Sequence, residues 1–122
     1  MSLPILIVDD NPMNLKLARV VLQSAGYDVR TAMNAEETMR VIGEARPRLI
    51  LMDLQLPDID GFELTRRIRA NPSLSGIIVL ALTAYAMKGD EERAYAAGCD
   101  GYIAKPIDTR TFAATIARWL DT

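Results

Sequence analysis

The sequence contains no histidine, which removes several kinds of chemistry at once. Without an imidazole the chain has no histidine general base, no histidine metal ligand and no phosphohistidine of its own. The single cysteine, Cys99, excludes an internal disulfide. We therefore expect Cys99 to be a small buried residue of a protein in the reducing cytoplasm.

Long apolar runs and a strong excess of charge are absent as well. No apolar run approaches the roughly 18 residues of a membrane span, and the N-terminus lacks a basic-then-apolar signal pattern. A net charge of −2 provides no attraction to nucleic acid or to an acidic membrane surface. The 122 residues suffice for one domain and not for two, so we expect a single domain over residues 1–122.

The chain does contain four short apolar runs, each followed by polar residues with useful chemistry. Residues 5–8 lead into Asp9 and Asp10, residues 49–52 into Asp53, residues 77–82 into Thr83, and residues 101–104 into Lys105. Continuous apolar runs of this length, bounded by turn residues, are typical of buried parallel strands.

Helical patterns separate the runs. Residues 12–25 predict a helix that begins at Pro12, ends before Gly26 and carries an apolar stripe of Leu15, Ala18, Leu22 and Ala25. Residues 28–32 indicate a short strand. Asn34 is suited to cap a helix with Ala35, Met39 and Ile42 facing inward. The predicted caps of the three later helices are Asp60, Asp90 and Asp108, with Gly98 closing the second of these helices.

Strict alternation of five strands and five helices predicts an α/β fold with a doubly wound parallel sheet. A chain of this length fits the flavodoxin-like strand order 2-1-3-4-5, whose switch point lies between strands 1 and 3. Ligands of such sheets bind outside the carboxyl ends of the strands. The polar residues that end the runs are therefore expected to share one pocket.

Three carboxylates would meet in that pocket. Asp9 and Asp10 alone also fit a solvated helix entry, but beside Asp53 they repel one another unless a cation or a lysine compensates. Mg²⁺ prefers oxygen ligands and keeps several waters, so two carboxylates and a backbone carbonyl suffice. Lys105 is expected to pair with Asp53, which has the character of a nucleophile toward phosphorus. Whether the bond after Lys105, to Pro106, is cis is left open.

The remaining candidates have plainer alternatives. Thr83 is suited to donate a hydrogen bond to a phosphoryl oxygen, although threonine is common at strand ends. Tyr102, taken alone, indicates half-buried packing on the last strand.

Together these stretches resemble the receiver domain of two-component response regulators. The matching segments are residues 5–11, 51–57 with Asp60 and Gly61, 81–84, and Lys105 with Pro106, in this order along the chain. The segment AYAMKGDEER at residues 84–93 is most similar to single-domain cell-division regulators and to receivers of hybrid kinases.

The resemblance implies that Asp53 accepts a phosphoryl group from a phosphohistidine of a histidine kinase or histidine phosphotransfer protein. It implies Mg²⁺, with Mn²⁺ as the alternative, at Asp10, Asp53 and the backbone carbonyl of Gln55, with Asp9 acting mainly through water. It implies that Thr83 and Lys105 bind the phosphoryl group.

The resemblance also implies that Tyr102 turns inward on activation, and that a downstream effector binds the face of helix 4, strand 5 and helix 5. It implies no enzymatic activity beyond self-phosphorylation and autodephosphorylation, and no direct contact with nucleic acid or membrane. A phosphorylation-dependent dimer, and excision of the domain from a larger hybrid kinase or regulator, stay open.

Three other functions fit the sequence less well. An aspartate-nucleophile phosphohydrolase places a second acid two residues after its nucleophile, where this chain has Gln55. A flavodoxin-like electron carrier needs a phosphate loop after strand 1, where Asp9 and Asp10 would repel phosphate. An inactive docking receiver usually lacks one of Asp53, Thr83 or Lys105, and all three are present.

Overall fold

The chain forms one five-stranded parallel sheet with the strand order β2-β1-β3-β4-β5, as the sequence predicts. The computed structural model describes residues 4–54, 56–83, 88–105 and 107–121, and only the backbone of residues 88–91. The strands are β1 (Ile5–Val8), β2 (Val29–Ala32), β3 (Leu49–Asp53), β4 (Ile78–Thr83) and β5 (Gly101–Ala104). β1 and β3 are buried along their whole length, which explains their continuous apolar sequence.

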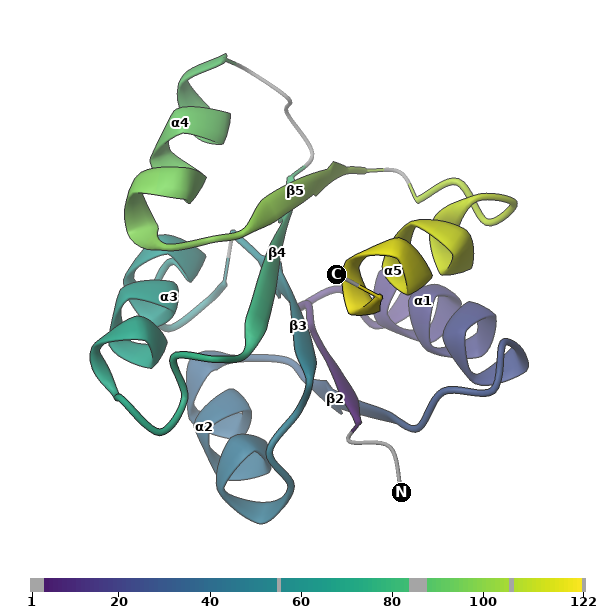
Figure 1. The fold of residues 1–122 in the computed structure, drawn as a ribbon, viewed down its shortest axis with the longest axis horizontal. Coiled ribbons are helices and arrows are strands. Elements are labelled where there is room, and N and C mark those ends of the chain that lie inside the picture. Colours follow the sequence, from purple (N-terminus) through teal and green to yellow (C-terminus); the bar gives the residue numbers. More distant parts are fainter. Residues whose placement is uncertain (1–3, 55, 84–87, 106, 122) are drawn as a thin grey trace.

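Five helices cover the two faces of the sheet. They are α1 (Pro12–Ser24), α2 (Ala35–Glu44), α3 (Gly61–Ala70), α4 (Lys88–Ala97) and α5 (Phe112–Leu120). Helices α1 and α5 lie on one face, and α2, α3 and α4 lie on the other (Figure 1). Each face has its own apolar core, with Leu22 and Ile116 in one core and Leu64 and Ile68 in the other.

Helix caps fix where the chain leaves each strand. Asn34 accepts a hydrogen bond from the Glu37 N–H at 2.8 Å, and Asp60 accepts one from the Glu63 N–H at 2.8 Å, so both predicted caps are confirmed. Asn11 caps α1 by accepting from Met13 N–H at 2.9 Å. Asn11 follows Asp10 directly, so this cap fixes the direction in which the chain leaves the acidic pair.

The structure confirms two further predictions, the end of α4 at Gly98 and the burial of Cys99. Gly98 ends α4 in the left-handed region at φ 110°, as expected of a helix-terminating glycine. Cys99 is buried, as predicted, and burial raises the pKa of its thiol. In the part of the chain that the structure describes, no helix combines the length and the apolar character needed to cross a membrane.

Three local predictions were wrong. Met39 is 39% exposed, because Thr38 takes the inward position and satisfies its hydroxyl on the Asn34 carbonyl at 2.7 Å. Helix α4 begins at Lys88 rather than after Asp90. Asp108 does not cap α5, which begins after Thr111 without a side-chain cap, because the Asp108 carboxylate instead accepts from Arg110 N–H within the preceding turn.

Candidate functional site

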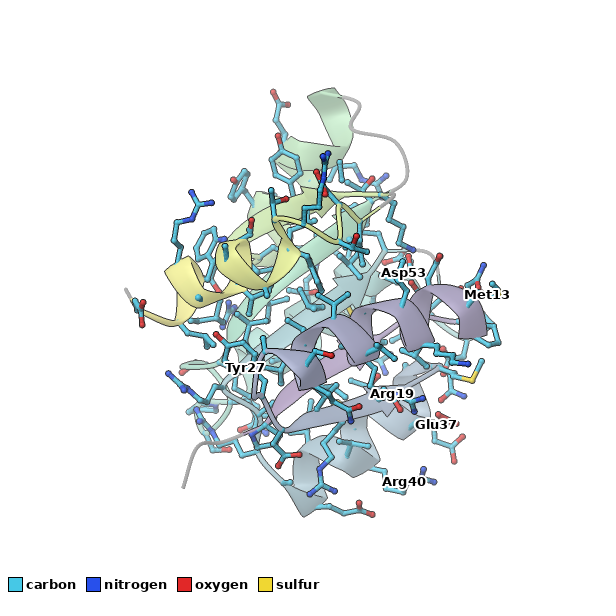
Figure 2. The ribbon with its side chains drawn as sticks, turned by 90° about the vertical axis from the view of Figure 1, so that its right-hand side faces the viewer. Met13, Arg19, Tyr27, Glu37, Arg40 and Asp53 are labelled. Carbon is cyan, nitrogen blue, oxygen red and sulfur yellow. The ribbon has the colours of Figure 1, made fainter. Side chains whose placement is uncertain are left out.

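The polar residues predicted to share a pocket do meet at the carboxyl edge of the sheet. Val8 lies beside Met52 in the β1–β3 register, so Asp9 and Asp53 follow at the same level. Thr83 ends β4 and lies opposite Ala104, one residue before Lys105. Figure 2 shows Asp53 at the end of the molecule where α1 begins, near Met13.

Three carboxylates form the acidic part of this pocket. One oxygen from each of Asp9, Asp10 and Asp53 lies within 4.8 Å of the other two. Asp9 and Asp53 are buried, whereas Asp10 is exposed. Because their donors are all hard oxygens, the set matches the ligand preference of a small divalent cation.

Lys105 brings a positive charge to the two buried carboxylates. Its ammonium lies 3.4 Å from Asp53 Oδ2, which is the expected ion pair, and 3.1 Å from Asp9 Oδ2. The other oxygen of Asp9 accepts a hydrogen bond from Asn11 N–H at 2.9 Å. The pairing of Lys105 with Asp9 was not anticipated from the sequence, because the strand order alone does not show that the lysine can reach β1. One ammonium thus compensates two buried charges.

Thr83 and Tyr102 sit on the neighbouring strands. Thr83 is buried, and its carbonyl accepts a hydrogen bond from Lys105 N–H at 2.7 Å, which fixes the two residues relative to each other. Tyr102 is half-buried, as predicted from its place on the strand, and packs against the core on the α2–α4 face. Gln55 and Pro106, on which the carbonyl ligand and the cis bond were predicted, lie outside the described residues.

The loop between β3 and α3 contains a residue that the sequence did not reveal. Both carboxylate oxygens of Asp58 lie 3.0 Å from the backbone nitrogen of Ala35 in α2, and Oδ2 lies 3.3 Å from that of Glu36. The Ala35 N–H bond outweighs burial and holds the pKa of Asp58 below its usual range. No spacing rule links positions this far apart in the sequence, so only the structure identifies the contact.

Helix α1 presents an exposed apolar row next to the acidic pocket. Met13, Leu17 and Val20 are 79%, 42% and 47% exposed and follow one another at helical spacing. With Pro12 and Lys16 they line a shallow groove that is mostly apolar. The row begins only three residues after Asp10.

Comparison with known proteins agrees with this geometry. A family profile for the response regulator receiver domain matches residues 5–117. The chain is similar to the polar-differentiation response regulator DivK of Brucella anthropi, with 44% identity over 116 residues, covering 95% of this chain and 94% of that protein.

Solved structures show the same likeness. The fold is similar to a CheY-like response regulator receiver domain protein from Methanospirillum hungatei, with a TM-score of 0.89, 32% identity, and coverage of 99% of this chain and 95% of that one. It is also similar to the chemotaxis response regulator CheY4 of Vibrio cholerae, with a TM-score of 0.90, 28% identity, and coverage of 97% and 98%.

Proposed function

The chain belongs to the response regulator receiver domain family, and from that premise we propose that Asp53 is the phosphoacceptor of a two-component phosphorelay. One observation carries the proposal. The Lys105 ammonium contacts the buried carboxylates of Asp9 and Asp53, in a pocket that Asp10 and Thr83 border. A carboxylate in this setting has its charge compensated and stays available as a nucleophile.

The acidic cluster fits a magnesium ion. Asp10 and Asp53 would hold it directly, and Asp9, already engaged by Lys105 and Asn11, would act through a water molecule. The predicted third ligand, the backbone carbonyl of Gln55, belongs to the same proposal. Mn²⁺ is the alternative ion. When bound, the metal supplies positive charge to the equatorial phosphoryl oxygens.

The phosphoryl donor has to be another protein, because this chain has no histidine. A carboxylate oxygen of Asp53 forms the new bond to phosphorus as the bond between phosphorus and the partner's imidazole nitrogen breaks, and the imidazole leaves. Lys105 and the Thr83 hydroxyl then stabilise the phosphoryl oxygens of the aspartyl phosphate. The donor is a histidine kinase or a histidine phosphotransfer protein, and the setting is the cytoplasm.

The exposed row of α1, namely Met13, Leu17 and Val20, is the proposed docking face for this donor. In this proposal the donor approaches Asp53 past the start of α1 and covers the first turns of this helix. Burying exposed apolar side chains there contributes favourable free energy to the complex.

The signal leaves through the face of α4, β5 and α5, toward a downstream effector or a second phosphorylated copy. Tyr102 on β5 is the proposed switch residue, together with Thr83 on β4. Apart from phosphorylating itself and losing the phosphoryl group again, the domain performs no catalysis in this account.

Removal of the metal tests the proposal. The protein is incubated with a small phosphodonor such as acetyl phosphate in Mg²⁺, in EDTA, and in EDTA followed by excess Mg²⁺. We expect a mass gain of about 80 Da, the phosphoryl group, in the first and third samples only. Equal labelling in EDTA would contradict the metal-assisted mechanism.

A further inference from the structure

Asp58 links two elements that approach the acidic pocket from different sides. It lies in the loop between β3 and α3, five residues after Asp53, and its carboxylate accepts hydrogen bonds from the first two N–H groups of α2. It also accepts from the N–H of Ile59 at 3.0 Å. Helix α2 already has its own cap in Asn34, so the bonds from Asp58 add a second attachment at the same helix end.

On the β3 side, this loop is fastened to the backbone of Asp53. Gly61 N–H, at the start of α3, donates to the Leu54 carbonyl at 3.1 Å. A side chain at Gly61 would overlap the Asp53 carbonyl oxygen and lie 2.8 Å from the Leu54 Cα, so only glycine allows this approach. Leu54 N–H in turn donates to Leu82 in β4 at 3.3 Å. The end of the loop at Gly61 is therefore packed against the backbone of Asp53 and hydrogen-bonded to the residue that follows it.

On the α2 side, the attachment leads to Asp9. Ala32, the last residue of β2, accepts a hydrogen bond from Asp9 N–H at 3.1 Å, and α2 begins three residues later. Asp9 is thus bonded to the end of β2, and β2 leads to the start of α2. The start of α2 is bonded to Asp58, whose loop between β3 and α3 contacts the backbone of Asp53. In this series Asp58 provides the side-chain link, whereas the contacts of Ala32, Leu54 and Gly61 are made by the backbone.

We propose that Asp58 is a positioning residue that fixes Asp53 relative to Asp9 and Asp10, and so sets the affinity of the acidic cluster for its divalent cation. The inference rests on the proposed function of that cluster. Residues that orient metal ligands from outside the ligand set commonly change metal affinity by about 10-fold or more when they are replaced.

Titration calorimetry with Mg²⁺ on the whole chain tests this role. Asp58→Ala removes the acceptor, and we expect Mg²⁺ to bind about 10-fold more weakly. Ala35→Pro removes the main donor without changing any charge. Ala35 is the first residue of α2, where proline is tolerated, and Asn34 before it is extended as proline requires. Ala35→Pro is expected to weaken Mg²⁺ binding in the same direction.

Two controls separate positioning from charge and from general destabilisation. Glu36→Gln removes one negative charge next to Asp58 and keeps the contact, so its Mg²⁺ affinity should stay within about 2-fold of the wild type. Asp60→Ala removes the neighbouring cap of α3 and leaves the α2 contact in place. It should therefore lower the melting temperature without a 10-fold loss of Mg²⁺ affinity.

The outcomes distinguish the two proposals. Weaker Mg²⁺ binding in Asp58→Ala and Ala35→Pro, but not in the controls, supports the positioning role, as does faster amide exchange at residues 54–61 in those two variants alone. Wild-type affinity in Ala35→Pro, or an equal loss in Glu36→Gln, overturns it while the metal site stands. A folded wild-type protein that binds no Mg²⁺ overturns the metal site itself. If Asp58→Ala does not fold, Ala35→Pro alone decides.

Discussion

Asp9 and Asp10 are adjacent in sequence but have different surroundings. Asp9 is buried, paired with the Lys105 ammonium at 3.1 Å and hydrogen-bonded to Asn11 N–H. Asp10 is exposed, and its carboxylate adds a third negative charge to the cluster. In the absence of metal, we therefore expect removal of the Asp10 charge to raise the free energy of unfolding and removal of the Asp9 charge to lower it.

The first prediction concerns this pair. In EDTA, Asp10→Asn should stabilise the fold by about 0.5 kcal/mol, or roughly 2 °C, because it relieves repulsion at an exposed position. Asp9→Asn should destabilise it by about 1–3 kcal/mol, because it removes a buried charged partner of Lys105. Thermal unfolding checks both. A lower melting temperature for Asp10→Asn would mean that its charge supports the fold, as at a helix start.

Asp58 carries the second prediction, which concerns acid stability. Its pKa is lowered in the folded state, chiefly by the Ala35 N–H bond. A lowered carboxyl pKa stabilises the fold above the ordinary value of about 3.9, and this contribution disappears as pH falls through the folded-state pKa. In chemical unfolding, the stability difference between wild type and Asp58→Asn should be constant from about pH 7 to 5 and should shrink as the pH falls further, through the lowered pKa of the folded state. A difference that persists unchanged at pH 2 would contradict the assignment.

At this scale, the sequence identified the residues whose position follows from a strand end. Asp53, Thr83 and Lys105 each come directly after a buried run, so sheet topology alone predicts that they meet. Asp58 could not be found in this way, because it lies in a loop and its partner Ala35 belongs to α2, 23 residues away in the sequence. Met39 was misassigned because helical spacing does not show that the buried Thr38 can satisfy its hydroxyl on the helix backbone.

At the scale of elements, helix starts were predictable where the cap is local. Asn34 and Asp60 bond to N–H groups three residues ahead, a pattern that the sequence displays directly. Asp108 also precedes a predicted helix as a cap would, but the chain makes a further turn before α5 begins. In that turn the Asp108 carboxylate accepts a hydrogen bond from Arg110 N–H. Cap-like residues therefore indicate that a helix is near, and only the turn geometry decides where it starts.

The third prediction belongs to α1. Leu17→Glu places a charge in the exposed apolar row and should slow phosphoryl transfer from a histidine donor by about 10-fold, because the donor loses an apolar contact at its docking face. Labelling by a small phosphodonor should not change, because that molecule needs no docking surface. Arg19→Ala, on the same helix (Figure 2) but outside the row, is the matched control. Equal slowing with both donors would place the defect in the pocket instead.

At the scale of the whole molecule, the alternation of strands and helices predicted a doubly wound parallel sheet, because crossovers between parallel strands have a fixed hand, and the chain length then selected the order 2-1-3-4-5 from the common strand orders. The proposed donor row lies on α1, and the proposed output face consists of α4, β5 and α5, of which α5 lies beside α1 (Figure 1). In the proposed mechanism, the signal passes from Asp53 to the output face through Thr83 on β4 and Tyr102 on β5. A coupling of about 1–3 kcal/mol is the usual size of such an effect.

The fourth prediction tests this coupling. Thr83→Ala should still accept the phosphoryl group at Asp53, because the nucleophile and Lys105 are intact. It should lose most of the phosphorylation-dependent change in amide exchange across residues 84–106, because the Thr83 hydroxyl no longer bonds to the phosphoryl group. Exchange changes equal to those of the phosphorylated wild type would show that Thr83 is not the coupling residue.

The identity of the phosphorylated residue tests the account most directly. Wild type, Asp53→Asn, Asp10→Asn and Thr83→Ala are each incubated with a small phosphodonor and Mg²⁺, and their intact masses and peptides are measured. We expect a gain of about 80 Da on the peptide containing Asp53 in wild type and Thr83→Ala, a reduced gain in Asp10→Asn, and none in Asp53→Asn. Labelling of Asp53→Asn to the wild-type level would contradict the central claim.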